Sequence, residues 1–261
     1  MTGNSLARQH VLVTGAGTGI GAAIALACAQ AGARVSLAGR RRDPLAELRT
    51  QISDDDAHVL ADFDVTDENK VRAGVAAARH AFGPVDILVN NAGEAPSAPL
   101  IKTDLATWNR VLAVNLTGTF LVTREVVPDM VAKRRGRVIN IASIAGLVGA
   151  AYVSAYVAAK HGVVGLTRSL ALEFAASGIT VNAVCPGYID TPLFQRALDN
   201  IVAKTKRARE DVRATLASSN PQRRLVTAEE VANTVLWLAS AGASAINGQA
   251  IAVAGGEVMV G

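Results

Sequence analysis

A glycine-rich segment near the amino terminus constrains the fold of this chain more than any other feature. Residues 10–14 (HVLVT) are a short apolar run that predicts a β-strand, and residues 22–33 (AAIALACAQAGA) predict a helix. A second apolar run, 35–38, follows the helix. The turn between the first strand and the helix contains Gly15, Gly17, Gly19 and Gly21. Such a β–α–β unit can hold a pyrophosphate through backbone amides and the helix dipole.

The spacing of this turn differs from the common G-x-G-x-x-G pattern. It reads T-G-x-x-x-G-x-G from Thr14 to Gly21, because position 20 is Ile. Glycine is needed where a side chain would block close approach of the backbone to a ligand. Thr18 and Ile20 lie between the glycines and are expected to line the same site. The alternative is a tight turn that binds nothing.

The residues after the second strand bear on the choice of cofactor. An NAD site usually places Asp or Glu at this strand end to accept a hydrogen bond from the ribose 2′-hydroxyl. This chain has Gly39 followed by Arg40, and a guanidinium suits a 2′-phosphate. Asp43 lies too far along to replace the missing carboxylate and is expected to open a helix with Pro44. NADP(H) is therefore favoured, with NAD(H) as the alternative.

Further apolar runs alternate with helical segments. Strands are predicted at 57–63, 85–89 and 138–142, and a helix is predicted to run to Phe82 from a cap at Thr66 or Asp67. This alternation predicts an α/β fold: a Rossmann-like, doubly wound parallel sheet of about seven strands with helices on both faces. No linker interrupts the pattern, so residues 1–261 are expected to form a single domain.

Several polar segments follow these strands directly. They are the glycine turn, Asp64, the NNAG segment at 90–93 and Ser143. Since ligands of such sheets bind beyond the carboxyl ends of the strands, these segments are expected to meet at one edge. A long helix is predicted from Asp104 to Lys133, with Asn115 in its interior and a kink at Pro128.

The segment after Ser143 contains a candidate acid–base pair. Tyr156 and Lys160 are four residues apart in a run of helix formers, so both side chains should leave one helix face. Tyrosine has an unperturbed pKa of about 10, and a nearby ammonium is expected to favour its phenolate. Ser143 could hold and orient a carbonyl oxygen. Tyr152 has Tyr156 rather than a lysine as its four-residue partner, and is interpreted as a pocket or packing residue.

Composition narrows the class of protein. No apolar run approaches the roughly 18 residues that span a bilayer, and no signal peptide is recognised, so neither a membrane nor secretion is expected. Two cysteines, Cys28 and Cys185, form no disulfide framework, which favours the cytoplasm. The histidines are scattered, so no metal site is predicted. The net charge of +4 comes without interleaved aromatic residues, so nucleic acid is not expected as a partner.

These motifs together resemble the short-chain dehydrogenase/reductase family over nearly the whole chain. The matching segments are TGAGTGIG (14–21), Asp64-Val65, NNAG (90–93), Asn115, Ser143, Tyr156-x-x-x-Lys160 and PGYIDT (186–191). The resemblance implies a catalytic tetrad of Asn115, Ser143, Tyr156 and Lys160. It implies that Lys160 binds the nicotinamide ribose and that Asn115 anchors a water.

The resemblance also implies a set of residues that bind the cofactor. They are Gly15, Gly17, Thr18, Gly19, Ile20, Gly21, Gly39, Arg40, Asp64, Val65, Asn91, Ala92, Gly93, Tyr156, Lys160, Pro186, Gly187, Ile189 and Thr191. Two positions depart from the family pattern. Glu94 follows NNAG where an apolar residue is more usual, so it could place charge near the ribose or point outward. Ala254 replaces the aspartate of the usual Asp-Gly-Gly.

Residues 192–221 are the least family-like part and are expected to form a helical lid over the substrate. The segment 190–224 contains eight Lys/Arg against four Asp/Glu. A basic lid would suit the phosphates of a coenzyme A or carrier-protein thioester, whereas a solvated helix without substrate contact is the alternative. Within the family, the segments KHGVVGLT and GITVNAVCPG are most similar to ketoreductases of 3-oxoacyl or polyketide thioesters.

The resemblance therefore implies hydride transfer between NADP(H) and a ketone or secondary alcohol, such as a 3-oxoacyl or cyclic ketone thioester. The alternative within the enzyme class is an NAD-dependent dehydrogenase of a secondary alcohol, 3-hydroxyacyl-CoA, steroid or sugar alcohol. A non-catalytic cofactor-binding sensor is the alternative class, and the intact Ser143, Tyr156 and Lys160 disfavour it. Family resemblance also implies a homotetramer, with a homodimer as the alternative.

Overall fold

A seven-stranded parallel sheet forms the centre of the protein in the computed structural model, which describes residues 5–259. Its strand order is β3-β2-β1-β4-β5-β6-β7. The strands are β1 (His10–Thr14), β2 (Arg34–Ala38), β3 (Ala57–Leu60), β4 (Ile87–Asn90), β5 (Gly136–Ile141), β6 (Ile179–Pro186) and β7 (Ala250–Val253). Every pairing is parallel. The predicted doubly wound α/β fold is confirmed.

Helices cover both faces of the sheet. The longer helices are α1 (Gly19–Gln30), α2 (Arg42–Arg49), α3 (Glu68–Phe82), α4 (Leu105–Leu112), α5 (Gly118–Lys133), α6 (Ser154–Phe174), α7 (Pro192–Thr205), α8 (Arg209–Ser218) and α9 (Ala228–Ala239). Short 3₁₀ turns occupy Asp54–Asp56, Leu100–Lys102, Ile144–Gly146, Ala175–Ser177 and Ala241–Ala243.

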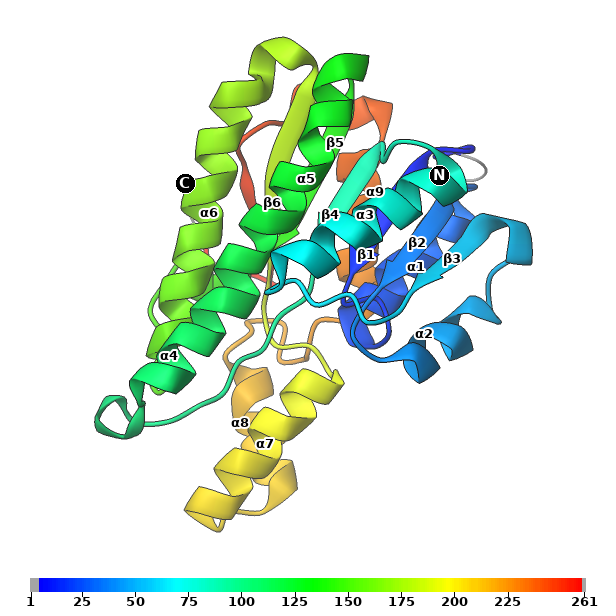
Figure 1. Ribbon diagram of the computed structural model, residues 1–261. Coiled ribbons are helices and arrows are strands. Elements are labelled where there is room, and N and C mark those ends of the chain that lie inside the picture. Colours follow the sequence, from blue (N-terminus) through cyan, green and yellow to red (C-terminus); the bar gives the residue numbers. More distant parts are fainter. Residues whose placement is uncertain (1–4, 260–261) are drawn as a thin grey trace.

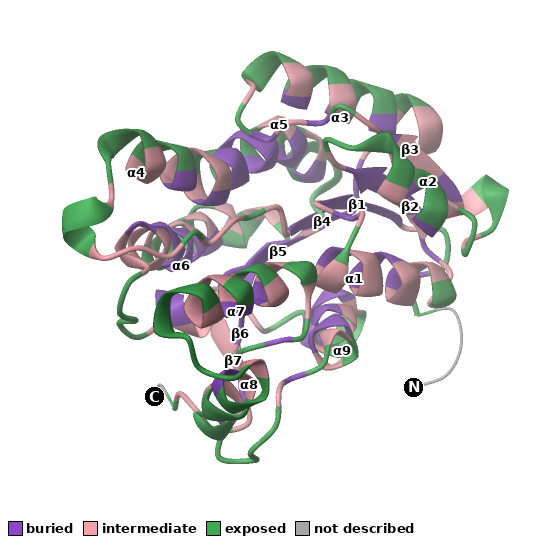
Figure 2. Ribbon diagram, turned by 90° about the horizontal axis from the view of Figure 1, so that it is seen from below, coloured by how far each residue is buried: buried purple, intermediate pink, exposed green. Residues whose placement is uncertain are grey.

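Two hydrophobic cores lie on opposite faces of the sheet. One includes buried residues of α1, α2 and α9, and the other includes buried residues of α3, α5 and α6. Figure 2 shows the buried strands between these helical layers, whose outer surfaces are exposed. Because both faces are covered, the strands consist of nearly continuous apolar runs, as their sequences predict.

Side-chain caps fix where several helices begin. Asp67, one of the two predicted caps, accepts hydrogen bonds from the backbone N–H groups of Asn69 and Lys70 at the start of α3. Thr227 and Glu230 form a reciprocal capping box at the start of α9. Each cap satisfies backbone donors that the first turn of a helix leaves without partners.

The helix predicted for 104–133 is interrupted. It consists of α4, a π-helical segment at Ala113–Thr117, and α5. Pro128 lies within α5, which continues to Lys133, so the irregularity is in the π segment that contains Asn115 rather than at the proline. A π segment adds a residue to one turn, and apolar spacing in the sequence does not reveal it.

The segment predicted as a lid forms two helices, α7 and α8, which project beyond the carboxyl ends of the strands (Figure 1). They pack on each other through a small core of their own, with Phe194, Leu198 and Val212 buried in it. Asn200 and Lys204 of α7 donate hydrogen bonds to the carbonyl oxygen of Ser97, in the loop after β4. The lid is thus attached to the domain mainly at its α7 side.

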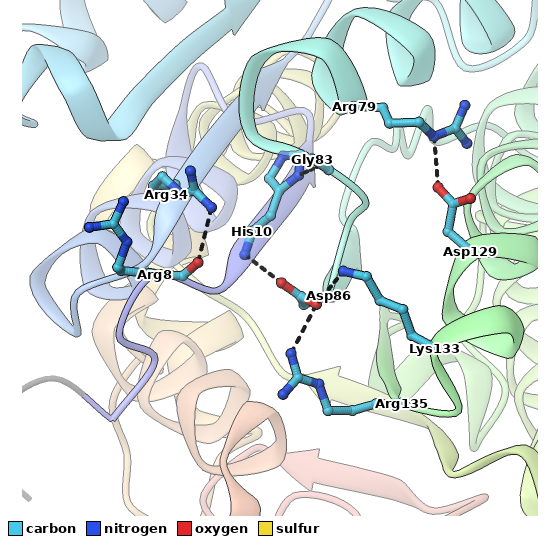
Figure 3. Close-up of polar contacts among 9 residues, drawn as sticks. All are labelled: Arg8, His10, Arg34, Arg79, Gly83, Asp86, Asp129, Lys133 and Arg135. Carbon is cyan, nitrogen blue, oxygen red and sulfur yellow. Dashed lines mark hydrogen bonds and ion pairs between the residues drawn. The ribbon is translucent and has the colours of Figure 1, made fainter.

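The opposite edge of the sheet holds an ionic network, shown in Figure 3. The carboxylate of Asp86, which directly precedes β4, accepts from the backbone N–H of His10 (3.0 Å), from Lys133 Nζ (3.1 Å) and from Arg135 Nη2 (3.2 Å). The imidazole of His10 is bonded to the carbonyl oxygen of Gly83 and to Ser36 Oγ. We call His10, Asp86, Lys133 and Arg135 the amino-edge cluster.

Candidate active site

A cleft of about 380 Å³ lies at the carboxyl edge of the sheet. Segments that are far apart in the sequence line it: the glycine turn, the ends of β2, β4 and β5, the π segment, the start of α6 and the first turns of α7. Most of the predicted site residues line it, namely Gly15, Gly17, Thr18, Gly19, Ile20, Gly39, Arg40, Asp64, Val65, Asn91, Ala92, Gly93, Asn115, Tyr156, Lys160 and Thr191.

The glycine turn fits a ligand that approaches the backbone. Gly15 and Gly19 have φ of +65° and +58°, in the left-handed region that favours glycine. A Cβ on Gly21 would lie 2.3 Å from the carbonyl oxygen of Gly15, so this glycine lets α1 pack on the turn and does not itself line the cleft. The amino end of the 12-residue helix α1 therefore opens into the cleft with no side chain in the way at Gly19.

Asn91 connects the end of β4 to this turn. Its side-chain Nδ2 donates to the carbonyl oxygens of Thr14 (3.0 Å) and Gly15 (3.2 Å), and its backbone N–H donates to Thr14 Oγ1 (3.0 Å). These bonds hold two walls of the cleft in register. They give Asn91 a structural role in addition to its place in the lining.

The end of β2 carries positive charge. Arg40 and Arg41 both line the cleft. The carboxylate of Asp64, which also lines the cleft, already has hydrogen-bond partners. Its Oδ1 accepts hydrogen bonds from the backbone N–H (2.9 Å) and the hydroxyl (2.8 Å) of Thr66. Burial acts to raise the pKa of Asp64, but these hydrogen bonds and the charge of Arg40 outweigh it and hold the pKa below its ordinary value. This corner of the cleft suits a phosphate.

Asn115 lies at the centre of the π segment and is fully buried. Its Nδ2 donates to the carbonyl oxygens of Glu94 and Val111, each at 2.9 Å. Its Oδ1 has no hydrogen-bond partner within residues 5–259. A Cβ on Gly93 would lie 2.8 Å from that oxygen. A buried acceptor without a donor is costly, so this atom points to a site for a water or ligand donor.

Lys160 is almost completely buried, at 4% exposure. Its Nζ donates to the carbonyl oxygen of Ile141, at 2.8 Å, and lies 5.5 Å from the centroid of the Tyr156 ring. Burial lowers the pKa of Lys160 to about 8. The predicted juxtaposition of Tyr156 and Lys160 on one face of a helix is thus present in α6.

The expected effect of Lys160 on Tyr156 is not seen in the chain alone. Tyr156 lines the cleft and is partly buried, and burial raises the pKa of its phenol to about 12. Hydrogen bonding with the Ser143 side chain opposes the shift only in part. The ammonium lies over the ring face and is bonded to Ile141, which explains why it does not dominate the hydroxyl. The phenol is protonated at neutral pH.

Ser143 follows β5 and caps the 3₁₀ turn at Ile144–Gly146, where its Oγ accepts from the backbone N–H of Ala145 at 3.1 Å. Its hydroxyl therefore has one local partner and also interacts with Tyr156. The residue interacts with the tyrosine on α6, as its place at a strand end predicts.

Some expected contacts are not part of the cleft lining. Pro186 is the last residue of β6, and the backbone N–H of Gly187 just after it donates to the carbonyl oxygen of Val253. Ile189 is buried in the core, where it forms a β-bridge with Val226. The interpretation of Tyr152 as a packing residue is wrong, because this residue is 67% exposed just before α6, and it does not line this cleft. Its φ of 68° turns the chain there, which the spacing of tyrosines could not indicate.

Other residues reach the cleft without having been predicted. Glu94, for which the sequence left two positions open, is among the residues that line it, and its Oε1 lies 3.2 Å from Arg110 Nε. Arg41, Leu193 and Arg196 also line it. The signal for Arg196 was present in the sequence, since it stands four residues after Pro192 on one helix face.

No helix within residues 5–259 is long and apolar enough to cross a membrane.

Comparison with known proteins places these features in a family. The profile of the short chain dehydrogenase family matches residues 9–201. The chain is 43% identical to cis-4-hydroxycyclohexanecarboxylate dehydrogenase of Sinomonas cyclohexanicum, over 99% of this chain and 100% of that protein. It is 37% identical to a 3-oxoacyl-[acyl-carrier-protein] reductase of Thermotoga maritima, over 95% and 97%. The crystal structure of a variant of actinorhodin polyketide ketoreductase with NADPH superimposes with a TM-score of 0.91, at 36% identity, covering 98% of this chain and 99% of that one.

Proposed function

The chain belongs to the short-chain dehydrogenase family, and from this premise we propose that it transfers hydride between NADP(H) and the carbonyl carbon of a ketone. It is an oxidoreductase of keto and hydroxyl groups, like its relatives. The single observation that carries the proposal is the placement of Tyr156 and buried Lys160 in the same cleft as the glycine turn.

The residues of the cleft fit a phosphorylated dinucleotide. The left-handed glycines and the amino end of α1 would hold the pyrophosphate. Arg40, with Arg41 beside it, would bind the 2′-phosphate, because the nearby carboxylate of Asp64 is bonded to Thr66. The bound cofactor supplies the hydride. NAD(H) is the alternative, and the absence of a free carboxylate at the end of β2 in the described residues disfavours it.

Tyr156 is proposed as the proton donor to the substrate oxygen. The phenol is protonated at neutral pH, as a proton donor to the substrate oxygen must be. Ser143 would donate a hydrogen bond to the same oxygen and so fix its direction. Lys160 would hold the cofactor ribose with the donors that Ile141 does not use, and Asn115 would hold a water through its free Oδ1.

The central experiment compares NADPH and NADH as reductants of β-ketoacyl thioesters, cyclic ketones, steroids and sugars. Wild-type protein should reduce at least one carbonyl class, and Tyr156→Phe should lose about a thousandfold in kcat. The matched control is Tyr152→Phe, which removes the hydroxyl of an exposed tyrosine just before α6 and should change nothing. Wild-type turnover by Tyr156→Phe would refute the mechanism.

Cofactor choice is tested separately. Arg40→Asp should shift the ratio of kcat/KM values toward NADH by about tenfold or more, because it replaces a favourable charge by a repulsive one. Arg42→Asp is the control, since Arg42 does not line the cleft. Equal ratios in wild type and Arg40→Asp would remove Arg40 from the proposal.

The substrate class is proposed from the relatives. A cyclic ketone or 3-oxoacyl thioester is favoured, because the names of two relatives specify a hydroxycyclohexane carboxylate and an acyl-carrier thioester. An alcohol dehydrogenase acting on a 3-hydroxyacyl-CoA, steroid or sugar alcohol is the alternative. A non-catalytic sensor would have no need of Tyr156 beside a buried lysine, and turnover in the assay above excludes it.

We further propose a single catalytic domain over residues 1–261 and a homotetramer, with a homodimer as the alternative. The support is that α4, α5 and α6 expose large apolar side chains: Leu105 at 70%, Phe120 at 42% and Leu172 at 83%. Light scattering during size-exclusion chromatography measures the number of subunits. A cytoplasmic location belongs to the same proposal, since Cys28 and Cys185 are both free and buried.

A further inference from the structure

Most of the positive charge on the lid is already engaged. Lys204 donates to the carbonyl oxygen of Ser97, Arg207 donates to Thr215, and Arg209 and Arg213 form ion pairs with Asp199 and Asp190. The basic character that the sequence predicts for the lid is therefore used largely within the lid and its attachment. Each of these four side chains thus already has a partner in the folded chain, and for Arg209 and Arg213 that partner is a carboxylate.

Arg196 is different from these residues. It lies on α7, is exposed and lines the cleft. Within residues 5–259 no carboxylate lies at ion-pair distance from it, and it donates no hydrogen bond. A guanidinium that faces a cleft without a partner can bind an anion without first breaking an internal contact.

The position of α7 indicates which part of the cleft Arg196 faces. The helix begins directly over the glycine turn, since a Cβ on Gly19 would lie 3.2 Å from Thr191 Cγ2 and 3.7 Å from Pro192 Cδ. Pro192 and Arg196 are four residues apart and both line the cleft, so they share one face of α7. Four residues of helix rise about 6 Å, which a long arginine side chain can span back toward Gly19.

The charges that face the cleft leave this end positive. The carboxylate of Asp64 is bonded to Thr66, and the carboxylate of Glu94 is paired with Arg110. Arg40 and Arg41 stand at the other wall, by the end of β2. The cleft thus has cations on two walls, and of the two carboxylates among its described lining residues one is hydrogen-bonded to Thr66 and the other lies at ion-pair distance from Arg110.

We propose that Arg196 binds the pyrophosphate of the cofactor from the lid side, opposite the amino end of α1. This inference rests on the proposed function and assigns Arg196 as a cofactor-binding residue of the lid. One guanidinium would then connect cofactor binding to the position of α7, while Arg40 recognises the 2′-phosphate at the other end. The two arginines would divide the phosphates of NADP(H) between them.

The test measures equilibrium binding with fragments of the cofactor. Dissociation constants are determined by titration calorimetry for NADPH, for ADP, which has the diphosphate but no 2′-phosphate, and for adenosine 2′-monophosphate, which has the reverse. Arg196→Gln should raise the dissociation constants of NADPH and ADP about tenfold or more and leave that of adenosine 2′-monophosphate unchanged. Arg40→Gln should raise the dissociation constants of NADPH and adenosine 2′-monophosphate and leave that of ADP unchanged.

The matched control is Lys206→Gln, which removes one charge from the carboxyl end of α7, outside the cleft lining. It should bind all three ligands as the wild type does. Thermal unfolding of Arg196→Gln should equal that of the wild type, because the side chain is exposed. A general effect of lid charge would weaken binding in both variants and would overturn the assignment.

Two further results would overturn it. One is wild-type affinity of Arg196→Gln for both NADPH and ADP. The other is an Arg196→Gln variant with a raised KM for a coenzyme A thioester and an unchanged KM for the phosphate-free pantetheine thioester, with cofactor binding as in the wild type. That result would assign Arg196 to a phosphate of the substrate. A wild-type protein that binds neither NADPH nor NADH would overturn the proposed function as well, so the two failures are distinguishable.

Discussion

The two edges of the sheet use similar side chains in opposite ways. At one edge, Asp86 of the amino-edge cluster accepts from three donors and its side chain is only 11% exposed (Figure 3). At the other, Asn115, Tyr156 and Lys160, which we call the carboxyl-edge cluster, have incomplete bonding. Lys160 Nζ has one acceptor, and Asn115 Oδ1 has no partner within residues 5–259.

This difference separates stability from function. A buried charge whose hydrogen bonds are all made by its neighbours has none left for a ligand, although removing one of its partners is destabilising. Buried donors or acceptors that lack a hydrogen-bond partner lower the stability of the fold. They are found where a ligand or a water supplies the missing hydrogen bond. The π segment that contains Asn115 is a second irregularity at the same edge, and such segments are frequent at functional sites. The comparison therefore assigns the chemistry to the carboxyl edge.

Among the tests of this comparison, the largest expected effect is the difference between a buried lysine, Lys160, and a partly buried one, Lys133. Lys160→Met should lower kcat about a hundredfold or more with little loss of stability, because it removes a buried cation that has only one hydrogen bond. Lys133→Met at the amino edge should leave kcat unchanged. Steady-state kinetics and urea unfolding of both variants measure the contrast. Equal kinetic losses in the two variants would abolish the distinction between the edges.

Asp86→Ala is the reverse experiment. Removing this carboxylate leaves the buried backbone N–H of His10 without its acceptor and the partly exposed Lys133 and Arg135 without their shared partner, and should cost about 2 kcal/mol in the free energy of unfolding. Activity per folded molecule should not change. Asp129→Ala, which breaks the more exposed pair with Arg79, should cost about 1 kcal/mol or less. A larger loss of kcat than of stability in Asp86→Ala would contradict a purely structural role.

The amino edge also predicts a pH dependence of stability. Burial lowers the pKa of His10 to about 4, below its unfolded value of about 6.5. Between pH 6.5 and 4 the unfolded chain therefore binds more protons at His10 than the folded chain does. The contribution of His10 to the free energy of unfolding is fully present above pH 6.5 and is lost as the pH falls through this window. The slope from this residue reaches about 1.4 kcal/mol per pH unit.

Urea unfolding at pH 7, 6 and 5 measures this slope. His10→Gln should flatten it even if the variant is less stable at pH 7. His58→Gln is the comparison: burial lowers the pKa of His58 as well, but this residue is less buried than His10, so the variant should flatten the slope less. A slope that persists in His10→Gln would mean that another group is responsible.

The smallest expected effect concerns Glu94, the carboxylate at the carboxyl edge that is paired with Arg110. Glu94→Gln breaks a partly exposed pair with Arg110 and should change stability by less than about 1 kcal/mol. It removes a negative charge from the cleft, so NADPH should bind about twofold more tightly. Calorimetric titration checks this. Weaker binding would mean that Glu94 contacts the cofactor as a hydrogen-bond acceptor.

The sequence by itself determined the architecture and most of the site. Apolar runs alternating with helices predict a parallel sheet, and the residues just after each strand must then meet at one edge. The four-residue spacing of Tyr156 and Lys160 predicts their common helix face, which α6 provides. These conclusions depend on local periodicity and strand direction, and both can be read along the chain.

Only the tertiary structure decided how the charges are used. Asp86 and Lys133 are 47 positions apart, and no local pattern pairs them. The pKa of Tyr156 depends on how closely the surrounding chain encloses the phenol, and the spacing to Lys160 does not reveal this burial. The basic lid likewise reads as uniform in sequence, although packing of α7 on α8 neutralises Arg209 and leaves Arg196 facing the cleft. Periodicity fixes which face a side chain occupies, whereas its partners and solvent exposure come from segments that meet only in the folded protein.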